Sequence, residues 1–308
     1  MENPNSDIIK NISAKGLRTT LIGIFSNLFL AITKTATGYL GNSYALIADG
    51  IESLSDVISS IIVYSGLKIA VKPPDENHPY GHGKAEPLAA SLVALALIIA
   101  AIVIIILSII EIINPHHAPE PFTLIVLLGV IIVKESLFKF VFKVGDTIES
   151  TAVKTDAWHH RSDAITSAAA FVGISIALIG GDGYESADDF AALVAAGIII
   201  FNAYKLLKPA VRDLMDHSPS ERVEIQIRES AKKVIGVIAL DKCKIRKMGF
   251  EYYVDLDIIV DGEISVRNGH QIAHDVKEVI RSYNPRVANV LIHIEPDDDE
   301  RIERADKL

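Results

Sequence analysis

The segment from Leu88 to Ile110 contains no charged side chain. A helix needs about 20 apolar residues to cross the hydrocarbon core of a bilayer. A helix buried inside a soluble protein is the alternative, but it is seldom so uniformly apolar. The segment therefore predicts a membrane-spanning helix. Since backbone polar groups in lipid must be satisfied within the segment, the prediction favours a helical membrane protein.

Other segments before residue 208 also combine high apolar content with few charges. Half of the 308 residues are hydrophobic and the mean hydropathy is +0.33, but average proteins are nearly as apolar, so the distribution carries the argument. We expect six spans in total. The other five are Thr19–Leu40, Tyr44–Ala70, Phe122–Phe142, Ala157–Gly180 and Phe190–Leu207.

The loop charges predict the orientation. The connections Gly41–Ser43, Asn114–Pro121 and Gly181–Asp189 contain no Lys or Arg, whereas the connections on the other side are rich in both. Basic residues are retained on the cytoplasmic side. We therefore expect a multi-pass protein of the cell membrane with both termini in the cytoplasm. The polar start of the chain has no apolar stretch typical of a cleavable signal peptide.

The composition changes after residue 208, and residues 209–308 are typical of a soluble domain. The predicted fold class is thus an α-helical membrane domain, residues 1–208, followed by an α+β domain of order α-β-β-α-β. The expected elements are a helix at Ser220–Ile235, strands at Val237–Lys247 and Tyr252–Val260, a helix at Val266–Tyr283 and a strand at Val287–Glu295.

Several function classes are disfavoured. A net charge of −9 argues against nucleic-acid binding. The single cysteine, Cys243, rules out a disulfide framework and a multi-thiolate zinc site. The chain lacks a P-loop, which leaves nucleotide-driven pumping unsupported. It also lacks the Glu-x-x-His motif of carboxylate-bridged oxidases. We therefore expect a protein that is not an enzyme.

Acidic residues in the second span are the strongest functional signal. Asp49, Glu52 and Asp56 lie at positions i, i+3 and i+7, which places them on one helix face. His159 and Asp163 in the fifth span also share a face, at i and i+4. Ionisable groups at membrane depth are costly and usually functional.

Two such helices, facing each other, would present Glu52, Asp56, His159 and Asp163 to one point. Four nitrogen and oxygen ligands suit Zn²⁺, and they also accept Mn²⁺, Fe²⁺ or Cd²⁺. We interpret Asp49 as a supporting hydrogen-bond acceptor.

The alternative is that these groups lie near helix ends and reach water. We expect this of Asp156 and Arg161, and we expect His160 to lie beside a ligand or at the surface. Between the second and third spans, Asp75, His78 and His82 supply a carboxylate and two imidazoles. They predict a surface metal site, or else a polar turn.

The strings ALIADGIESLSD, NHPYGHGKAE and DAWHHRSD resemble the cation diffusion facilitator family, and the resemblance extends over nearly the whole chain. It implies a homodimer that exports divalent cations from the cytoplasm against protons. It places the transport site on Glu52, Asp56, His159 and Asp163, and a loop site on Asp75, His78 and His82. It implies a metallochaperone-like soluble domain with metal positions at Asp241, Asp257, His270, His293 and Glu295, and a charge pair between Lys84 and Asp216. His274, one turn from His270, is either a substitute ligand or a solvent-facing residue.

The expected mechanism is alternating access. Metal ligation needs deprotonated carboxylates and a neutral imidazole, so binding releases protons, and protons can later displace the ion. Metal would also draw together the two soluble domains of a dimer. A cation channel and a transport-inactive metal-sensing partner subunit are the alternatives.

Overall fold

The computed structural model describes residues 6–40, 44–113, 121–180 and 187–298. These residues divide into two compact units, which we describe separately. One contains residues 12–72 and 85–211, and the other contains residues 73–84 and the chain from residue 212 onward.

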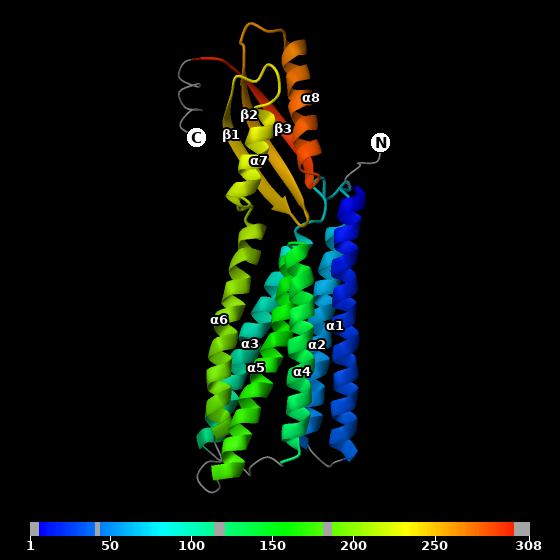
Figure 1. The fold of residues 1–308 in the computed structure, drawn as a ribbon, viewed down its shortest axis with the longest axis vertical. Coiled ribbons are helices and arrows are strands. Elements are labelled where there is room, and N and C mark those ends of the chain that lie inside the picture. Colours follow the sequence, from blue (N-terminus) through cyan, green and yellow to red (C-terminus); the bar gives the residue numbers. More distant parts are fainter. Residues whose placement is uncertain (1–5, 41–43, 114–120, 181–186, 299–308) are drawn as a thin grey trace. The chain divides into compact units, whose positions relative to one another are not determined.

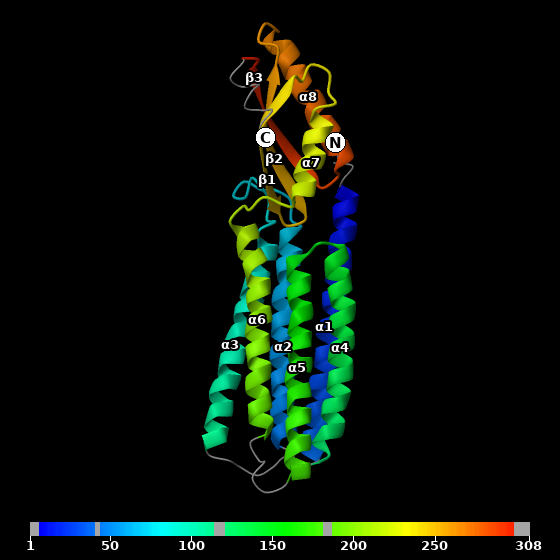
Figure 2. The same ribbon diagram turned by 60° about the vertical axis from the view of Figure 1, so that its left-hand side comes forward.

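The first unit is helical, and its helices run side by side (Figures 1 and 2). Five of the six predicted spans fall within one long helix each, and Phe122–Phe142 begins one residue before its helix, so their helical structure is confirmed. Several helices are longer than the predicted spans, because polar residues at the ends of a span continue the helix. They are α1 (Ser6–Leu40), α2 (Tyr44–Ala70), α3 (Ala85–Ile113), α4 (Thr123–Thr147), α5 (Thr151–Gly180) and α6 (Ala187–Leu214).

Among the described residues, three helices are long and apolar enough to cross a membrane by composition. They contain Asn11–Thr33, Ala85–Ile110 and Leu193–Leu214. The remaining helices, α2, α4 and α5, carry more ionisable side chains in their apolar segments. These are the helices that bear the candidate ligands and a buried lysine described below.

Helix α3 buries mainly small side chains and exposes mainly large ones. Ala90, Ala94 and Ala101 are buried, whereas Leu92 is 49% exposed and Ile99 is 62% exposed. A soluble helix shows the reverse pattern, because water would drive the larger apolar groups inward. Small residues at helix contacts and large apolar residues outside are typical of helices packed within lipid.

The second unit contains α7 (Glu221–Ala231), β1 (Ala239–Met248), β2 (Glu251–Val260), α8 (Val266–Tyr283) and β3 (Val287–Pro296). The order α-β-β-α-β is confirmed. The sheet order is β1-β2-β3. Strands β1 and β2 pair antiparallel, and β2 pairs parallel with β3 through the α8 crossover.

The sheet has one covered and one open face. Side chains at alternate positions of β2, such as Leu256 and Ile258, pack with Ile227 of α7 and Val276 of α8. Both helices lie on this face (Figure 2). Because strand side chains alternate, the intervening positions of β2, such as Asp257, lie on the face opposite to the helices.

Cys243 gives a test of this core. Burial raises the pKa of its thiol from 9.0 to about 11. The reactive species is the thiolate, so alkylation near pH 8 should be about 100-fold slower in the folded chain than in denaturant, as followed by mass spectrometry. The raised pKa also means that this thiol stabilises the fold below pH 9 and loses that contribution as pH rises toward 11. Equal alkylation rates in both states would contradict this burial.

Candidate metal-binding sites

The first candidate site lies between α2 and α5. Asp56 is buried, and its Oδ1 lies 3.0 Å from Nε2 of His159. One ligand atom from each of Asp56, His159 and Asp163 lies within 4.8 Å of the others, a spacing that one ion could bridge. Three of the four expected transport ligands are thus brought together. The side chains of Glu52 and Asp49 lie outside the described residues.

A fourth group in this site was missed in the sequence analysis. Lys134 of α4 is 1% exposed. Its Nζ donates to Oδ2 of Asp56 at 2.7 Å and to Oδ2 of Asp163 at 2.8 Å. A third hydrogen bond, of 2.9 Å, reaches Oδ1 of Asn27 on α1. The signal was a charge in the middle of an apolar segment, which at membrane depth points to function.

A cavity of about 170 Å³ adjoins the cluster. Asp56, His159 and Asp163 line it together with two serines, Ser59 and Ser162. The rest of the lining is small or apolar and comes from α3 and α6: Ala96, Leu97, Ala100, Ala101, Ile104 and Ile199. Since one water takes about 30 Å³ in the liquid, the space is large enough for a small ion with a few waters.

The expectation for Asp156 was wrong, and His160 lies beside the candidate ligand His159 rather than at the surface. Asp156 is fully buried rather than in contact with water, and its Oδ1 accepts a hydrogen bond of 2.9 Å from Ser60. His160 is also fully buried, and a side chain at Gly23 of α1 would come within 3.1 Å of its Nε2. Arg161 is partly exposed, with its guanidinium 4.4 Å from the centre of the Phe138 ring. The sequence could not reveal that α1 and α2 cover this face of α5.

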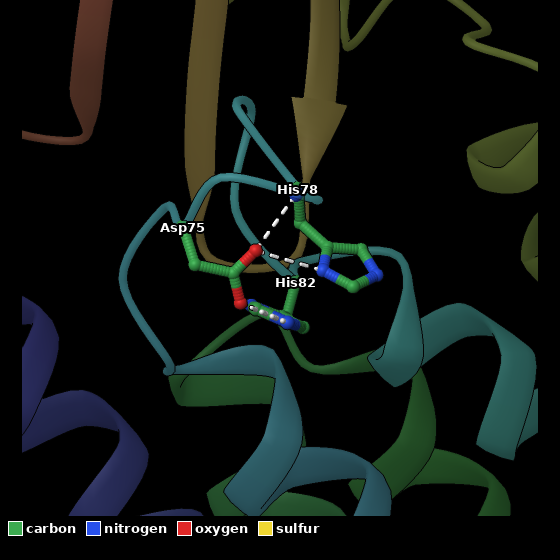
Figure 3. Close-up of side chains that lie close together, drawn as sticks. All are labelled: Asp75, His78 and His82. Carbon is green, nitrogen blue, oxygen red and sulfur yellow. Dashed lines mark hydrogen bonds and ion pairs between the residues drawn. The ribbon is translucent and has the colours of Figure 1, made fainter.

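The second candidate site is the loop between α2 and α3. Oδ1 of Asp75 accepts from the backbone N of His78 at 2.7 Å and lies 3.0 Å from its Nδ1. Oδ2 lies 3.3 Å from Nε2 of His82. Figure 3 shows both imidazoles turned toward the one carboxylate. The three expected loop residues therefore form one cluster.

Asp75 should be the main charge of the loop site. The hydrogen bond from His78 lowers the pKa of this carboxyl below its ordinary value, so it is ionised at neutral pH. We expect Asp75→Asn to weaken Zn²⁺ binding at the loop by at least about tenfold. The measurement is calorimetry on full-length protein carrying Asp56→Asn and His293→Ala, which isolates the loop.

The matched control for this prediction is Glu76→Gln in the same background. Glu76 is exposed and outside the cluster, so this change should leave binding unaltered. Equal weakening by both variants would mean that the general negative charge of the loop, rather than a ligand, attracts the ion.

The loop is fixed against the β1–β2 turn within the same unit. A Cβ at Gly83 would lie 2.4 Å from the carbonyl carbon of Met248 and 2.9 Å from the backbone N of Gly249, so only glycine permits this approach. The ring of Tyr80 lies edge-on to Tyr253, with ring centres 5.8 Å apart. The loop ligands and the C-terminal domain are therefore mechanically connected.

The expected charge pair is present in this region. Nζ of Lys84 lies 2.6 Å from Oδ1 of Asp216 and also donates to the backbone carbonyl of Asp213. Asp213 in turn accepts from Lys247 of β1 at 2.9 Å. These pairs tie the end of the loop to the last turn of α6 and to Asp216 just after it.

The third candidate site lies on the open face of the sheet. Nδ1 of His293 lies 3.7 Å from Asp257 Oδ1 and 3.5 Å from Glu295 Oε1. The three residues form a cluster that could hold an ion. Asp257 and His293 are paired neighbours on β2 and β3. Nζ of Lys242 lies 3.5 Å from Asp257, which weakens the negative charge of this site.

Two other expected ligands of this domain are placed differently. Asp241 is buried, 3.9 Å from Lys242, beside a bulge in β1. His270 lies on α8 with its ring 4.9 Å from that of His274. Because α8 packs on the covered face, His270 is separated by the sheet from the Asp257 cluster. The sequence indicated residue types that can bind metal, but it did not indicate on which side of the sheet each of them lies.

Similarity to known proteins extends over nearly the full chain. The family model described as "Cation efflux transmembrane domain" matches residues 20–215, and the one described as "Cation efflux protein, cytoplasmic domain" matches residues 219–297. The chain is 31% identical to the manganese efflux system protein MneP of Bacillus subtilis, over 91% of this chain and 95% of MneP. It is 32% identical to metal tolerance protein C1 of Arabidopsis thaliana, over 92% of this chain and 63% of that protein.

A further relative is the magnetosome protein MamB of Magnetospirillum gryphiswaldense, with 27% identity over 88% of this chain and 91% of MamB. Among solved structures, the C-terminal domain of MamM matches at a TM-score of 0.25 with 27% identity. The match covers 25% of this chain and 98% of that domain.

Proposed function

Because this chain belongs to the cation diffusion facilitator family of divalent-metal transporters, we propose that it exports divalent cations from the cytoplasm in exchange for protons. The observation that carries the proposal is the convergence of Asp56, His159 and Asp163 beside a cavity in the helical unit. Ionisable side chains inside a membrane bundle are costly, and they usually mark a pathway for a substrate, an ion or protons.

The donor set defines the substrate class. Asp56, Asp163 and His159, with Glu52 as the proposed fourth ligand, give three carboxylates and one imidazole. Our sequence-based expectation is Zn²⁺, which accepts such donors in tetrahedral geometry. Carboxylate-rich sites also suit Mn²⁺, and the similarity to a manganese efflux protein supports that ion as the second candidate. Fe²⁺ and Cd²⁺ complete the set to be tested.

Proton exchange follows from the ligands. The ion binds carboxylates and a neutral imidazole, so protons are released when it binds and compete with it when the site opens to the other side. Alternating access of the site to the two sides would then couple the two fluxes. Both termini lie in the cytoplasm in this proposal, in agreement with the loop charges.

Transport by the purified protein in sealed vesicles tests the proposal. Vesicles containing a pH-sensitive dye should show proton movement opposite to Zn²⁺ or Mn²⁺ entry, and the ratio of initial rates ranks the ions. Cation flux without proton movement would indicate a channel. Absence of both fluxes would indicate a transport-inactive partner subunit.

The soluble domain is proposed to form a homodimer through the open sheet face. This face carries the Asp257 cluster and Leu291, which is 64% exposed. A metal ion shared by His293 and its neighbours would draw two copies together. Distances between spin labels at Glu278→Cys on α8, measured in the full-length protein, should shorten with Zn²⁺. His293→Ala should remove that change, and unchanged distances in the parent protein would contradict metal-driven closure.

A further inference from the structure

We propose that Lys134 is a tethered counter-cation of the transport site: its ammonium group holds Asp56 and Asp163 while no divalent ion is bound, and it withdraws when the ion enters. This inference rests on the proposed function, because it takes those two carboxylates as ligands of the transported ion. It adds a residue that competes with the substrate for its own site.

The contacts of Lys134 support this role. An ammonium group has three hydrogen-bond donors, and the three acceptors around Nζ are Asp56, Asp163 and Asn27 at 2.7 to 2.9 Å. Two of them are the carboxylates of the candidate metal cluster. The lysine thus occupies the position between these carboxylates that a divalent ion would need.

The charges prevent Lys134 and a divalent ion from binding the two carboxylates at the same time. Without a cation, Asp56 and Asp163 would face each other in a buried site, and like charges at that distance repel strongly. The ammonium compensates them. A divalent ion at ligand distance from the same two oxygens would lie next to the ammonium, and two cations in a poorly screened site also repel. Either cation satisfies the carboxylates, and both together do not.

The cavity gives an ion an approach that does not pass Lys134. The cavity reaches Asp56, His159 and Asp163 from the side of α3 and α6, and Lys134 is not among its lining residues. Lys134 comes from α4 and is also held by Asn27 of α1. An ion can therefore arrive from one side while the flexible lysine stem retracts on the other.

Metal binding to full-length variants tests the inference. We expect Lys134→Met, which keeps the length but removes the charge, to bind Mn²⁺ at least tenfold more tightly in calorimetry. Its transport rate should fall, because the empty site then lacks a countercharge. Lys134→Arg should bind as weakly as the parent. The parent carries His82→Ala and His293→Ala so that only the membrane site is titrated.

The matched control is Lys139→Met, on the same helix but exposed to solvent and 3.7 Å from Glu135, which should not change Mn²⁺ affinity. Unchanged or weaker binding by folded Lys134→Met would overturn the inference. If Lys134→Met does not fold, Asn27→Ala replaces it. That change loosens the lysine without removing a carboxylate and should tighten binding several-fold, and unchanged affinity would again overturn the inference.

Asp163→Ala separates the two proposals. If the parent binds Mn²⁺ through Asp163 but Lys134→Met is no tighter, only the counter-cation is wrong. If adding Asp163→Ala leaves Mn²⁺ binding unchanged in both the parent and Lys134→Met, the transport site itself is wrong.

Discussion

Asp56→Asn and Asp163→Asn should each reduce divalent-cation transport by about a hundredfold or more. Each change removes one anionic ligand while preserving side-chain shape, and it leaves Lys134 with a single carboxylate partner. Removing one member of a buried charge pair typically costs about 3 kcal/mol or more, which corresponds to roughly a hundredfold in affinity. The measurement is initial rate of Mn²⁺ or Zn²⁺ uptake into vesicles, together with the dye-reported proton flux.

Asp146→Asn is the matched control for these two variants. Asp146 lies near the end of α4, exposed, and pairs with Lys154 at 2.7 Å. Exposed pairs contribute little, about 0 to 1 kcal/mol, so this variant should transport at the parent rate. Transport at the parent rate by Asp56→Asn or Asp163→Asn would remove the site between α2 and α5 from the mechanism.

Gly66→Ala should destabilise the helical unit strongly although it adds a single methyl group. A Cβ at this position would lie 2.4 Å from Cβ of Ala89 and 3.0 Å from the carbonyl oxygen of Ala85 on α3. Neither atom is the movable end of a long side chain, so α2 and α3 must separate. Overpacking of this kind costs about 1 to 3 kcal/mol, and we expect a fall of several degrees in the unfolding temperature in detergent.

The fluorescence of Trp158, the single tryptophan, reports this unfolding because its ring packs 5.4 Å from that of Phe138. Gly129→Ala is the control. Gly129 lies in α4, and a Cβ there would meet nothing within 4 Å. Since Ala is the better helix former, Gly129→Ala should leave the unfolding temperature unchanged or slightly raised. A similar fall in both variants would mean that helix geometry, rather than the α2–α3 contact, is responsible.

Much of the site could be predicted from spacing. In α2 and α5, the i, i+4 positions fix which side chains share a helix face, so Asp163 was expected beside His159 before any packing was known. In the C-terminal domain, a strand was predicted at Tyr252–Val260, and it lies within β2. Local periodicity determines such features, because it depends on helix and strand geometry alone.

Lys134 and Asp156 illustrate the limit of that reasoning. Each has a hydrogen-bond partner on another helix: Asp56 for Lys134 and Ser60 for Asp156. Periodicity gives the face of a helix but not which neighbour it meets. For this reason Asp156 was expected near water, and Lys134 was not predicted to be part of the site.

The sequence by itself determined the six helices, the α-β-β-α-β order and the residue types available to bind metal, because these depend on local composition and periodicity. Only the tertiary structure decided which of them meet. It brought Lys134 between two carboxylates, and it placed Asp257, His293 and Glu295 on the sheet face away from His270. The physical reason is that helix neighbours and sheet faces are set by packing between segments far apart in the chain.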